Sequence, residues 1–254
     1  MRSRVLALAG LLALPTLAAA QGGSLPTLPN PYQLAPARFT ITPFVGVRVP
    51  YTTGDEYLST QSQGTYLVQE ERAGGVMIGA ELQGQVRGPL GVAGSLAYGG
   101  GGTTSITLTS QDGEQTPLTT SGPDMWMGKV GITYRLPEPR SDTRRFHPAG
   151  FLVAGPARVR TNFDNDDDSG ADWAKGTTNW GFNLGVHTAT LIGSSQRFAL
   201  HLGLEDFVTF WNTDRIAGRD AAVYGGFFDE DTAVRVDYST SNVVLVRAGV
   251  SFRF

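Results

Sequence analysis

The stretch that decides the fold is Asn242-Val-Val-Leu-Val-Arg-Ala-Gly-Val-Ser-Phe-Arg-Phe254. Its even positions from 244 onward are all apolar, whereas its odd positions include Arg247, Gly249, Ser251 and Arg253. A period of two residues is that of a β-strand whose two faces meet different surroundings. The stretch therefore predicts a strand with one face against an apolar medium and the other against a polar one.

Seven earlier segments show the same alternation, which gives eight predicted strands. They cover residues 39–51, 76–87, 91–108, 125–136, 149–163, 179–192 and 197–212. In the segment 149–163, the alternation places Phe151, Val153 and Val159 on the apolar face and Arg158 and Arg160 on the polar face.

The joins between these segments alternate in length. Those near residues 87–90 and 193–196 are tight turns and the one at 139–148 is of modest length, whereas those at 52–71, 109–123, 164–178 and 213–239 are long and polar. An even number of strands with short turns on one rim and long loops on the other is typical of a bacterial outer-membrane barrel. We predict an all-β fold, an eight-stranded antiparallel transmembrane β-barrel with long extracellular loops and short periplasmic turns.

A water-soluble sandwich or lipocalin-like barrel also alternates, but it turns its apolar face inward and needs a charged exterior. Only 17% of the 254 residues are charged, and the non-apolar faces are mostly Gly, Ser, Thr, Gln and Ala. That composition favours a narrow filled lumen. Aromatic residues at strand ends, such as Trp126, Trp180 and Phe198, fit the girdles at the two membrane interfaces.

The N-terminal residues have the pattern of an export signal. Met1-Arg-Ser-Arg4 is basic, Val5 to Leu17 is apolar but too short to span a bilayer as a helix, and Ala18-Ala19-Ala20 provides a small-residue cleavage site. We predict a signal peptide at 1–20, a Pro-rich periplasmic lead-in at 21–37 and the outer-membrane barrel domain at 38–254. The absence of Cys excludes disulfides and thiolate metal sites, and a net charge of −3 gives no reason to expect nucleic-acid binding.

With this signal peptide, these eight strands and a C-terminal aromatic residue, the chain resembles the small outer-membrane β-barrels of the OmpA-like and OmpX-like kind. In that family the barrel-assembly machinery recognises the last strand and its final aromatic residue. The resemblance implies the same assembly-signal role for Val250, Phe252 and Phe254. We expect a monomer whose partners are outer-membrane lipid and, during biogenesis, the assembly machinery.

An eight-stranded barrel is just wide enough for its inward side chains to fill it, so we predict a packed polar lumen. Its inward charges are two glutamates and three cations at similar depth, namely Glu81, Lys129, Arg158, Glu205 and Arg247. Because buried charges are costly unless they are paired, we expect these five to form a network that blocks ion flow. If the hairpin around residues 213–239 is regular, Glu205 and Arg247 face each other.

Most of the 23 acidic residues lie in the four long joins. One join places Asp164, Asp166, Asp168 and Asp172 with the alternation of oxygen ligands found in calcium loops, although the glycine comes one place late and the final Glu is missing. That mismatch favours a solvated acidic loop over a metal site. We predict no cofactor, with calcium or magnesium at the acidic loops as the alternative.

Catalytic motifs are present only as fragments. The three histidines, His147, His187 and His201, have no nucleophile at the spacing that a Ser–His pair on one strand face requires. A lumen histidine hydrogen-bonded to polar neighbours is the simpler interpretation. We therefore predict a non-enzymatic outer-membrane protein with a structural or surface-interaction role. The alternatives are a narrow passive conduit for small solutes or ions and an outer-membrane lipid-modifying enzyme.

Overall fold

The computed structural model describes residues 37–52, 54–61, 64–100, 102–121, 124–137, 148–162, 177–192, 196–225 and 232–254. All of them belong to one compact unit, Pro31–Phe254. The predicted signal peptide, the lead-in up to residue 36 and the four aspartates of the acidic loop considered for calcium lie outside the described residues.

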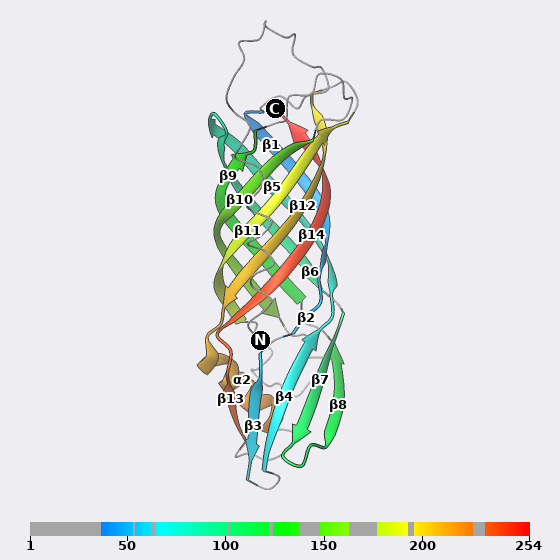
Figure 1. The fold of residues 1–254 in the computed structure, drawn as a ribbon, viewed down its shortest axis with the longest axis vertical. Helices are drawn as coiled ribbons and strands as arrows, with labels where there is room; N and C mark the ends of the chain where they lie inside the picture. The colour runs from blue at the N-terminus through cyan, green and yellow to red at the C-terminus, as the bar shows by residue number, and fades with distance from the viewer. Residues whose placement is uncertain are drawn as a thin grey trace, which may run out of the picture. The chain divides into compact units, whose positions relative to one another are not determined.

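Eight strands form a closed antiparallel barrel, as predicted (Figure 1). They are β1 (Phe39–Arg48), β5 (Gly75–Arg87), β6 (Leu90–Gly100), β9 (Asp124–Arg135), β10 (Ala149–Asn162), β11 (Thr177–Leu191), β12 (Phe198–Phe210) and β14 (Thr240–Arg253). Each barrel strand pairs with its neighbours in the chain order of the eight, and β1 pairs with β14 to close the ring. The barrel therefore has no free strand edge.

The closing seam between β1 and β14 is held at one end by two backbone hydrogen bonds. The amide of Phe39 donates to the carbonyl of Phe254 at 3.3 Å, and the amide of Phe254 donates to the carbonyl of Phe39 at 2.9 Å. Next to them Pro43 has no amide hydrogen, and the ladder skips it. The neighbouring Thr42 and Ser251 hydroxyls are hydrogen-bonded across the seam at 2.8 Å.

The outward faces of seven strands carry the apolar residues that the alternation predicts. Examples of exposed apolar residues from five strands are Val47, Ile78, Ile132, Leu204 and Val246. Within each strand the alternate residues point into the lumen and are mostly buried. Side chains that would be buried in a water-soluble domain thus cover the outside of the barrel.

Strand β10 turns the opposite face to the lumen from the one that the alternation predicts, so the prediction for Arg158 was wrong. Val153, Ala157 and Val159 are buried in the lumen, and Arg158 is exposed on the outside. Its guanidinium lies over the ring of Trp180, 5.2 Å from the ring centre. At this level the lumen is apolar, so the apolar side chains of β10 turn inward and its arginines turn outward.

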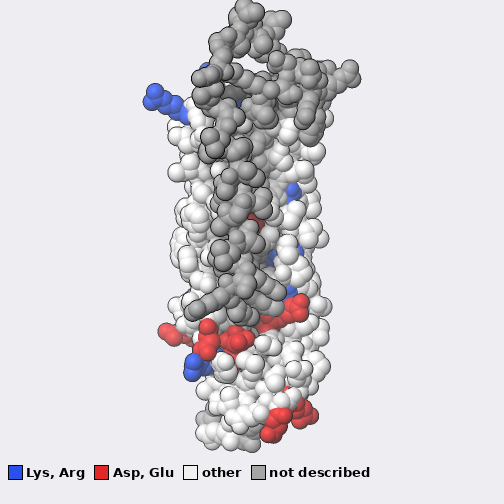
Figure 2. Space-filling model, viewed as in Figure 1, with Lys and Arg blue, Asp and Glu red and all other residues white. Residues whose placement is uncertain are grey.

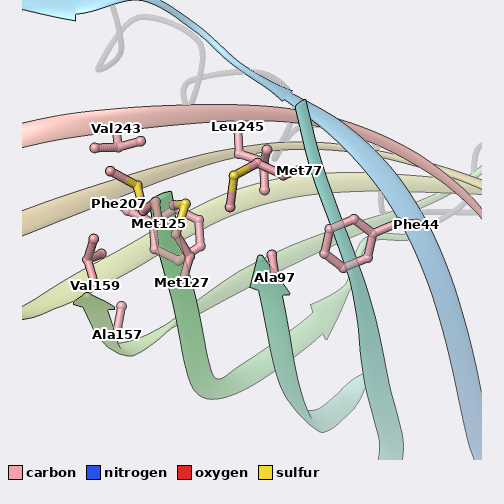
Figure 3. Close-up of a cluster of buried hydrophobic side chains, with 10 residues drawn as sticks. All are labelled: Phe44, Met77, Ala97, Met125, Met127, Ala157, Val159, Phe207, Val243 and Leu245. Atoms are coloured by element: carbon pink, nitrogen blue, oxygen red, sulfur yellow. The ribbon is translucent and has the colours of Figure 1, made fainter. Parts of the chain in front are cut away.

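The lumen is not polar throughout, contrary to the prediction. Ten buried apolar residues from seven strands form one cluster inside the barrel, shown in Figure 3. They are Phe44, Met77, Ala97, Met125, Met127, Ala157, Val159, Phe207, Val243 and Leu245. This apolar plug fills the half of the lumen nearer to the long joins.

A second sheet forms mostly from segments that the sequence predicts to be polar loops, together with the end of the predicted strand 91–108. Its order is β13-β3-β4-β7-β8, with β2 paired to β4. The strands are β2 (Tyr51–Thr52), β3 (Glu56–Thr60), β4 (Gly64–Arg72), β7 (Thr103–Ser110), β8 (Gln115–Ser121) and β13 (Ala233–Val236). Leu58, Val68 and Leu108 are buried together on this sheet. The predicted strand 91–108 is therefore two strands, and its Leu108 does not belong to the barrel.

The second sheet is continuous with the barrel hairpin β5–β6. Strand β4 leads into β5 through Ala73 and Gly74, and the Ala73 amide donates to the carbonyl of Thr103 at 2.9 Å. On the other arm, Gly102 adopts a φ of +86°, which favours glycine, immediately before β7. One long hairpin thus runs from the barrel wall into the second sheet (Figure 1).

Helix α2 (Thr213–Gly225) lies between β12 and β13. The Asn212 side chain caps it, because its Oδ1 accepts a hydrogen bond from the Arg215 amide at 3.0 Å. Ile216 anchors the helix, with 2% of its surface exposed. In the part of the chain that the structure describes, no helix has both the length and the apolar character needed to cross a membrane.

Candidate functional site

Five charged or titratable side chains meet in the middle of the lumen. They are Glu81 from β5, Lys129 from β9, His187 from β11, Glu205 from β12 and Arg247 from β14. We call them the lumen charge cluster. None of the five is more than 4% exposed.

The two glutamates and the two permanent cations of the cluster are paired with each other. Lys129 Nζ lies 2.7 Å from Glu205 Oε1 and 3.3 Å from Glu81 Oε2. Arg247 bridges the same carboxylates, with Nη2 2.6 Å from Glu81 Oε2 and Nε 2.9 Å from Glu205 Oε1. Because each cation contacts both carboxylates, removing any one side chain breaks more than one pair.

Neighbouring groups add further contacts. His187 Nε2 lies 2.9 Å from Glu205 Oε1, and the Asn183 amide donates to Glu205 Oε2 at 3.2 Å. The Arg247 guanidinium lies 4.5 Å from the centre of the Phe44 ring, at the border with the apolar plug. Such hydrogen bonds are needed, since attraction alone repays the cost of burying charges only in good geometry.

Inward-facing glycines give the cluster its room. A Cβ atom on Gly203 would lie 2.9 Å from both Arg247 Nε and His187 Cδ2. A Cβ on Gly185 would lie 3.0 Å from Glu205 Cγ and 3.2 Å from His187 Nε2. Gly203 lies directly opposite Arg247 and Gly185 opposite Glu205, so a glycine faces each of these side chains across the sheet.

The structure brings together four of the five predicted lumen residues, Glu81, Lys129, Glu205 and Arg247. Arg158 is not part of the cluster, because it lies on the outward face of β10. Glu205 and Arg247 are diagonal neighbours on one face, since the register pairs Glu205 with Leu245 and Arg247 with Gly203. The register is offset by two residues from that of a regular hairpin.

Sequence reasoning placed His187 in the lumen with polar neighbours but left it out of the network. The signal was available, because His187 has inward parity on β11 and that strand is adjacent to β12, which carries Glu205. His201, also on β12, is 5% exposed, and its ring lies edge-on to His187 with the ring centres 5.1 Å apart.

On the side away from the apolar plug, the lumen contains a cavity of about 60 Å³. Three small inward residues, Ala149, Ala189 and Ala199, leave this end less filled than the middle. Ala189, Ala199 and His201 line the cavity, together with polar residues that include Gln83 and Thr133. The lumen thus has three levels, with the cavity first, then the charge cluster and then the apolar plug.

Beyond the barrel, a buried polar contact joins the second sheet to the segment before β14. The Tyr238 hydroxyl donates to Glu56 Oε1 at 2.8 Å, and Glu56 is 3% exposed. Burial and the nearby Glu56 carboxylate raise the pKa of Tyr238 above its usual value. Burial disfavours the phenolate, so the hydroxyl stays protonated and keeps donating to the carboxylate.

No protein-family model and no curated protein matches the chain in sequence. Among solved structures, the fold is similar to that of the outer membrane protein OprG from Pseudomonas aeruginosa, with a TM-score of 0.52 and 12% identity over 88% of this chain and 98% of OprG. Neisserial surface protein A (NspA) gives 0.42 and 10% identity over 86% of this chain and 98% of that one. The attachment invasion locus protein Ail of Yersinia pestis gives 0.31 and 11%, over 84% and 98% respectively.

The chain has the fold of the small eight-stranded outer-membrane β-barrels, as the resemblance predicted. At 12% identity the likeness to OprG concerns the fold alone.

Proposed function

We propose that this chain is an integral outer-membrane protein whose barrel is a closed anchor in the bilayer and whose second sheet lies at the cell surface. The observation that carries the proposal is the belt of exposed apolar side chains on the outside of the closed barrel. Described members that are at least 44% exposed include Val45, Val47, Val76, Ile78, Leu82, Val92, Leu96, Val130, Ile132, Phe182, Val186, Leu202, Leu204 and Val246. Soluble monomers rarely expose so large a contiguous apolar surface, whereas a barrel in a lipid bilayer has an outward apolar band of this kind.

Aromatic pairs lie at both ends of this belt. Tyr98 and Trp126 have ring centres 4.6 Å apart near the second sheet, and Phe198 and Phe252 have theirs 5.6 Å apart at the opposite end. Strand β12, from Phe198 to Phe210, has 13 residues. At a rise of about 3.3 Å per residue and a tilt of about 40°, it covers about 30 Å along the barrel axis. That height matches the hydrocarbon core of a bilayer.

Charge is distributed as this placement requires. Arg158 and Arg160 point outward, and both lie in the half of β10 nearer to the second sheet, where an arginine can reach the headgroups. Figure 2 shows acidic side chains gathered where the barrel meets the second sheet and on the second sheet itself, while the described barrel wall in that view is mostly uncharged. We place this acidic end outside the cell, where divalent ions can bridge it to lipid phosphates.

The lumen is blocked at two levels, which favours a structural or surface-interaction role over a conduit. The charge cluster fills the middle of the barrel with paired side chains, and the apolar plug fills the half beyond it. An ion would have to break buried ion pairs and then cross a layer of Met, Phe, Leu and Val. His187 is engaged with Glu205 and Arg247, so its ring serves the ion network in place of a catalytic pair.

Cell fractionation and planar-bilayer recording test this function together. We expect the protein in the outer-membrane fraction, heat-modifiable on a gel, with its second sheet cleaved by protease added to whole cells. Purified barrel should give no steady conductance, and outer-membrane lipid should have the same acylation with and without the gene. Steady conductance would favour the conduit, altered acylation would favour the enzyme, and a protein recovered in the soluble fraction would contradict the whole proposal.

A further inference from the structure

Three lumen side chains place ligand-type atoms close together. Glu81, His187 and His201 each offer one carboxylate oxygen or ring nitrogen, and these atoms all lie within 4.8 Å of one another. They come from β5, β11 and β12, and none of the three side chains is more than 5% exposed. Two imidazoles and one carboxylate form the ligand set of many zinc sites with an open fourth position.

Glu81 and His201 each have one buried polar atom without a hydrogen-bond partner in the described part of the chain. Glu81 Oε1 and His201 Nε2 are buried and make no hydrogen bond to any described residue. Buried polar atoms without a partner are rare, and each calls for an explanation, such as a bound ion. Glu81 directs its second oxygen, Oε2, to Arg247 at 2.6 Å, which leaves Oε1 facing His187 Nδ1 at 3.8 Å.

The third ligand is already oriented by a second carboxylate. His187 Nε2 lies 2.9 Å from Glu205 Oε1, so the ring's other nitrogen, Nδ1, is the one turned to Glu81. A histidine that ligates a metal almost always donates its other N–H to such a partner. Glu205 thus acts as a positioning residue for His187 and lies outside the ligand set.

One of the three side chains, His201, lines the cavity of about 60 Å³, which has room for a water molecule beside that ring.

From this arrangement we infer that Glu81 Oε1, His187 Nδ1 and His201 Nε2 bind a divalent transition metal ion, for which Zn²⁺ is the probe. Tetrahedral zinc with bonds of about 2.0–2.1 Å holds its ligand atoms about 3.4 Å apart, so the three side chains close in by small rotations. Arg247 Nη2, now 3.2 Å from His187 Nδ1, shifts aside and keeps its contact with Glu81 Oε2.

Charge balance gives the site a second signature. Lys129 and Arg247 already neutralise the two carboxylates, so an incoming metal ion competes with them. Replacing Lys129 with methionine leaves one carboxylate charge unbalanced, which the metal ion can neutralise. Lys129→Met should therefore bind Zn²⁺ at least about tenfold more tightly than the unmutated barrel.

Isothermal titration of Zn²⁺ into the folded full chain in detergent tests the site. We expect one ion per barrel, and His201→Ala or Glu81→Gln should weaken binding by about 100-fold, since losing even an outer-shell partner costs about 10–100-fold. His147→Ala, which removes the third histidine of the sequence, is the matched control and should bind as the unmutated chain does.

Heat-modifiable mobility shows whether each variant is folded, and the comparison uses only folded protein. Absorption bands of tetrahedral Co²⁺ in the unmutated barrel provide a second measurement that requires no variant to fold. Equal Zn²⁺ affinity in His201→Ala and the unmutated chain would assign binding to another place. If the unmutated barrel binds no Zn²⁺, the space between Glu81, His187 and His201 is not a metal site. Either result overturns the site.

Discussion

At the scale of single residues, the lumen charge cluster depends on the balance between its negative and positive charges. Its two carboxylates and two permanent cations share four contacts of 2.6–3.3 Å. Pairs of this kind add little stability over a well-packed apolar core, but losing one member is costly because it leaves an uncompensated buried charge. The cluster is therefore more sensitive to single substitutions than to paired ones.

Replacing Glu205 with glutamine tests this balance. The change leaves Lys129 and Arg247 with only the Glu81 carboxylate, so we expect a loss of about 3–5 kcal/mol. The measurement is thermal or urea unfolding of the purified barrel in detergent. The double variant Glu205→Gln/Lys129→Met restores one anion to one cation and should recover much of the loss. A double variant as unstable as Glu205→Gln alone would contradict the charge-balance explanation.

Substituting Gly203 tests how tightly the lumen charge cluster is packed. Gly203→Ala puts a Cβ 2.9 Å from Arg247 Nε and His187 Cδ2, and overpacking of this kind typically costs about 1–3 kcal/mol. The control is Gly94→Ala, whose nearest contact would be an ordinary 3.7 Å to the Lys129 carbonyl. Unfolding temperatures of the two variants provide the comparison. Equal temperatures would show that the cluster has more room than its geometry indicates.

Much of the cluster could be predicted from the sequence, because inward parity and similar depth select Glu81, Lys129, Glu205 and Arg247. The exact contacts could not be predicted, because the sequence pattern does not give the structure of the segment between β12 and β14. The register offset of two residues between Glu205 and Arg247 arises there. Parity is unaffected by an even offset, which is why the two residues still share a face.

At the scale of elements, β10 shows where alternation alone misleads. Its segment from Ala157 to Thr161 alternates small or apolar residues with arginines, which fits a strand of either orientation. The choice depends on what occupies the lumen at that level, and there Val159 lies opposite Met127 of β9. An apolar lumen takes the valine, and the outward arginine packs on Trp180.

Most of the second sheet, apart from β7, was predicted as loops for a related reason. Its strands are short and rich in Thr and Ser, and few of their apolar side chains are buried, with Leu58, Val68 and Leu108 at the centre. The sheet is completed by pairings between segments distant in sequence, β3 with β13 and β4 with β7. A local pattern does not contain that information.

Tyr238 links the elements of this sheet, and Tyr238→Phe measures the link. The variant removes a hydrogen bond to a buried carboxylate, for which about 1.5 kcal/mol is expected, at the lower end of the range for charged partners. Because Glu56 makes other interactions as well, the sheet should loosen without unfolding. Faster limited proteolysis of the second sheet, with an unchanged barrel, is the expected result.

The same residue predicts a pH dependence. The pKa of Tyr238 is raised in the folded protein, so its contribution to stability is complete below about pH 10 and declines as the pH rises further. Protease resistance of the second sheet should therefore begin to fall above about pH 10, and Tyr238→Phe should flatten that fall. An identical slope in the variant would assign the effect to other groups.

At the scale of the whole molecule, the number of strands, their antiparallel order and the closure of the barrel all follow from the sequence pattern. They do so because a barrel that spans a bilayer needs an outward apolar face of nearly constant length, and seven of the eight strands show it as alternation. The contents of the lumen obey no such rule. Paired charges and apolar side chains both fill it, so the apolar plug could not be predicted from the pattern.

Phe254 tests assembly of the molecule. Its ring is 70% exposed and lies 6.4 Å from that of Phe39, so it adds little to packing. Phe254→Gln should therefore refold in detergent with nearly unchanged stability. In cells, the same variant should reach the outer membrane poorly and be degraded, since the family resemblance implies that this residue is the assembly signal. Unchanged amounts of heat-modifiable barrel in the outer membrane would contradict that role.

The hydrogen bonds between Phe39 and Phe254 make the barrel a ring in which no strand is intrinsically first. A circular permutant, joined from Phe254 to Phe39 through a short flexible linker and opened between Gly88 and Pro89, would keep every pairing of the wall. It would also move the final aromatic residue away from the chain end. Such a chain would separate two kinds of information, the pairing of the strands and the assembly signal that the family resemblance implies.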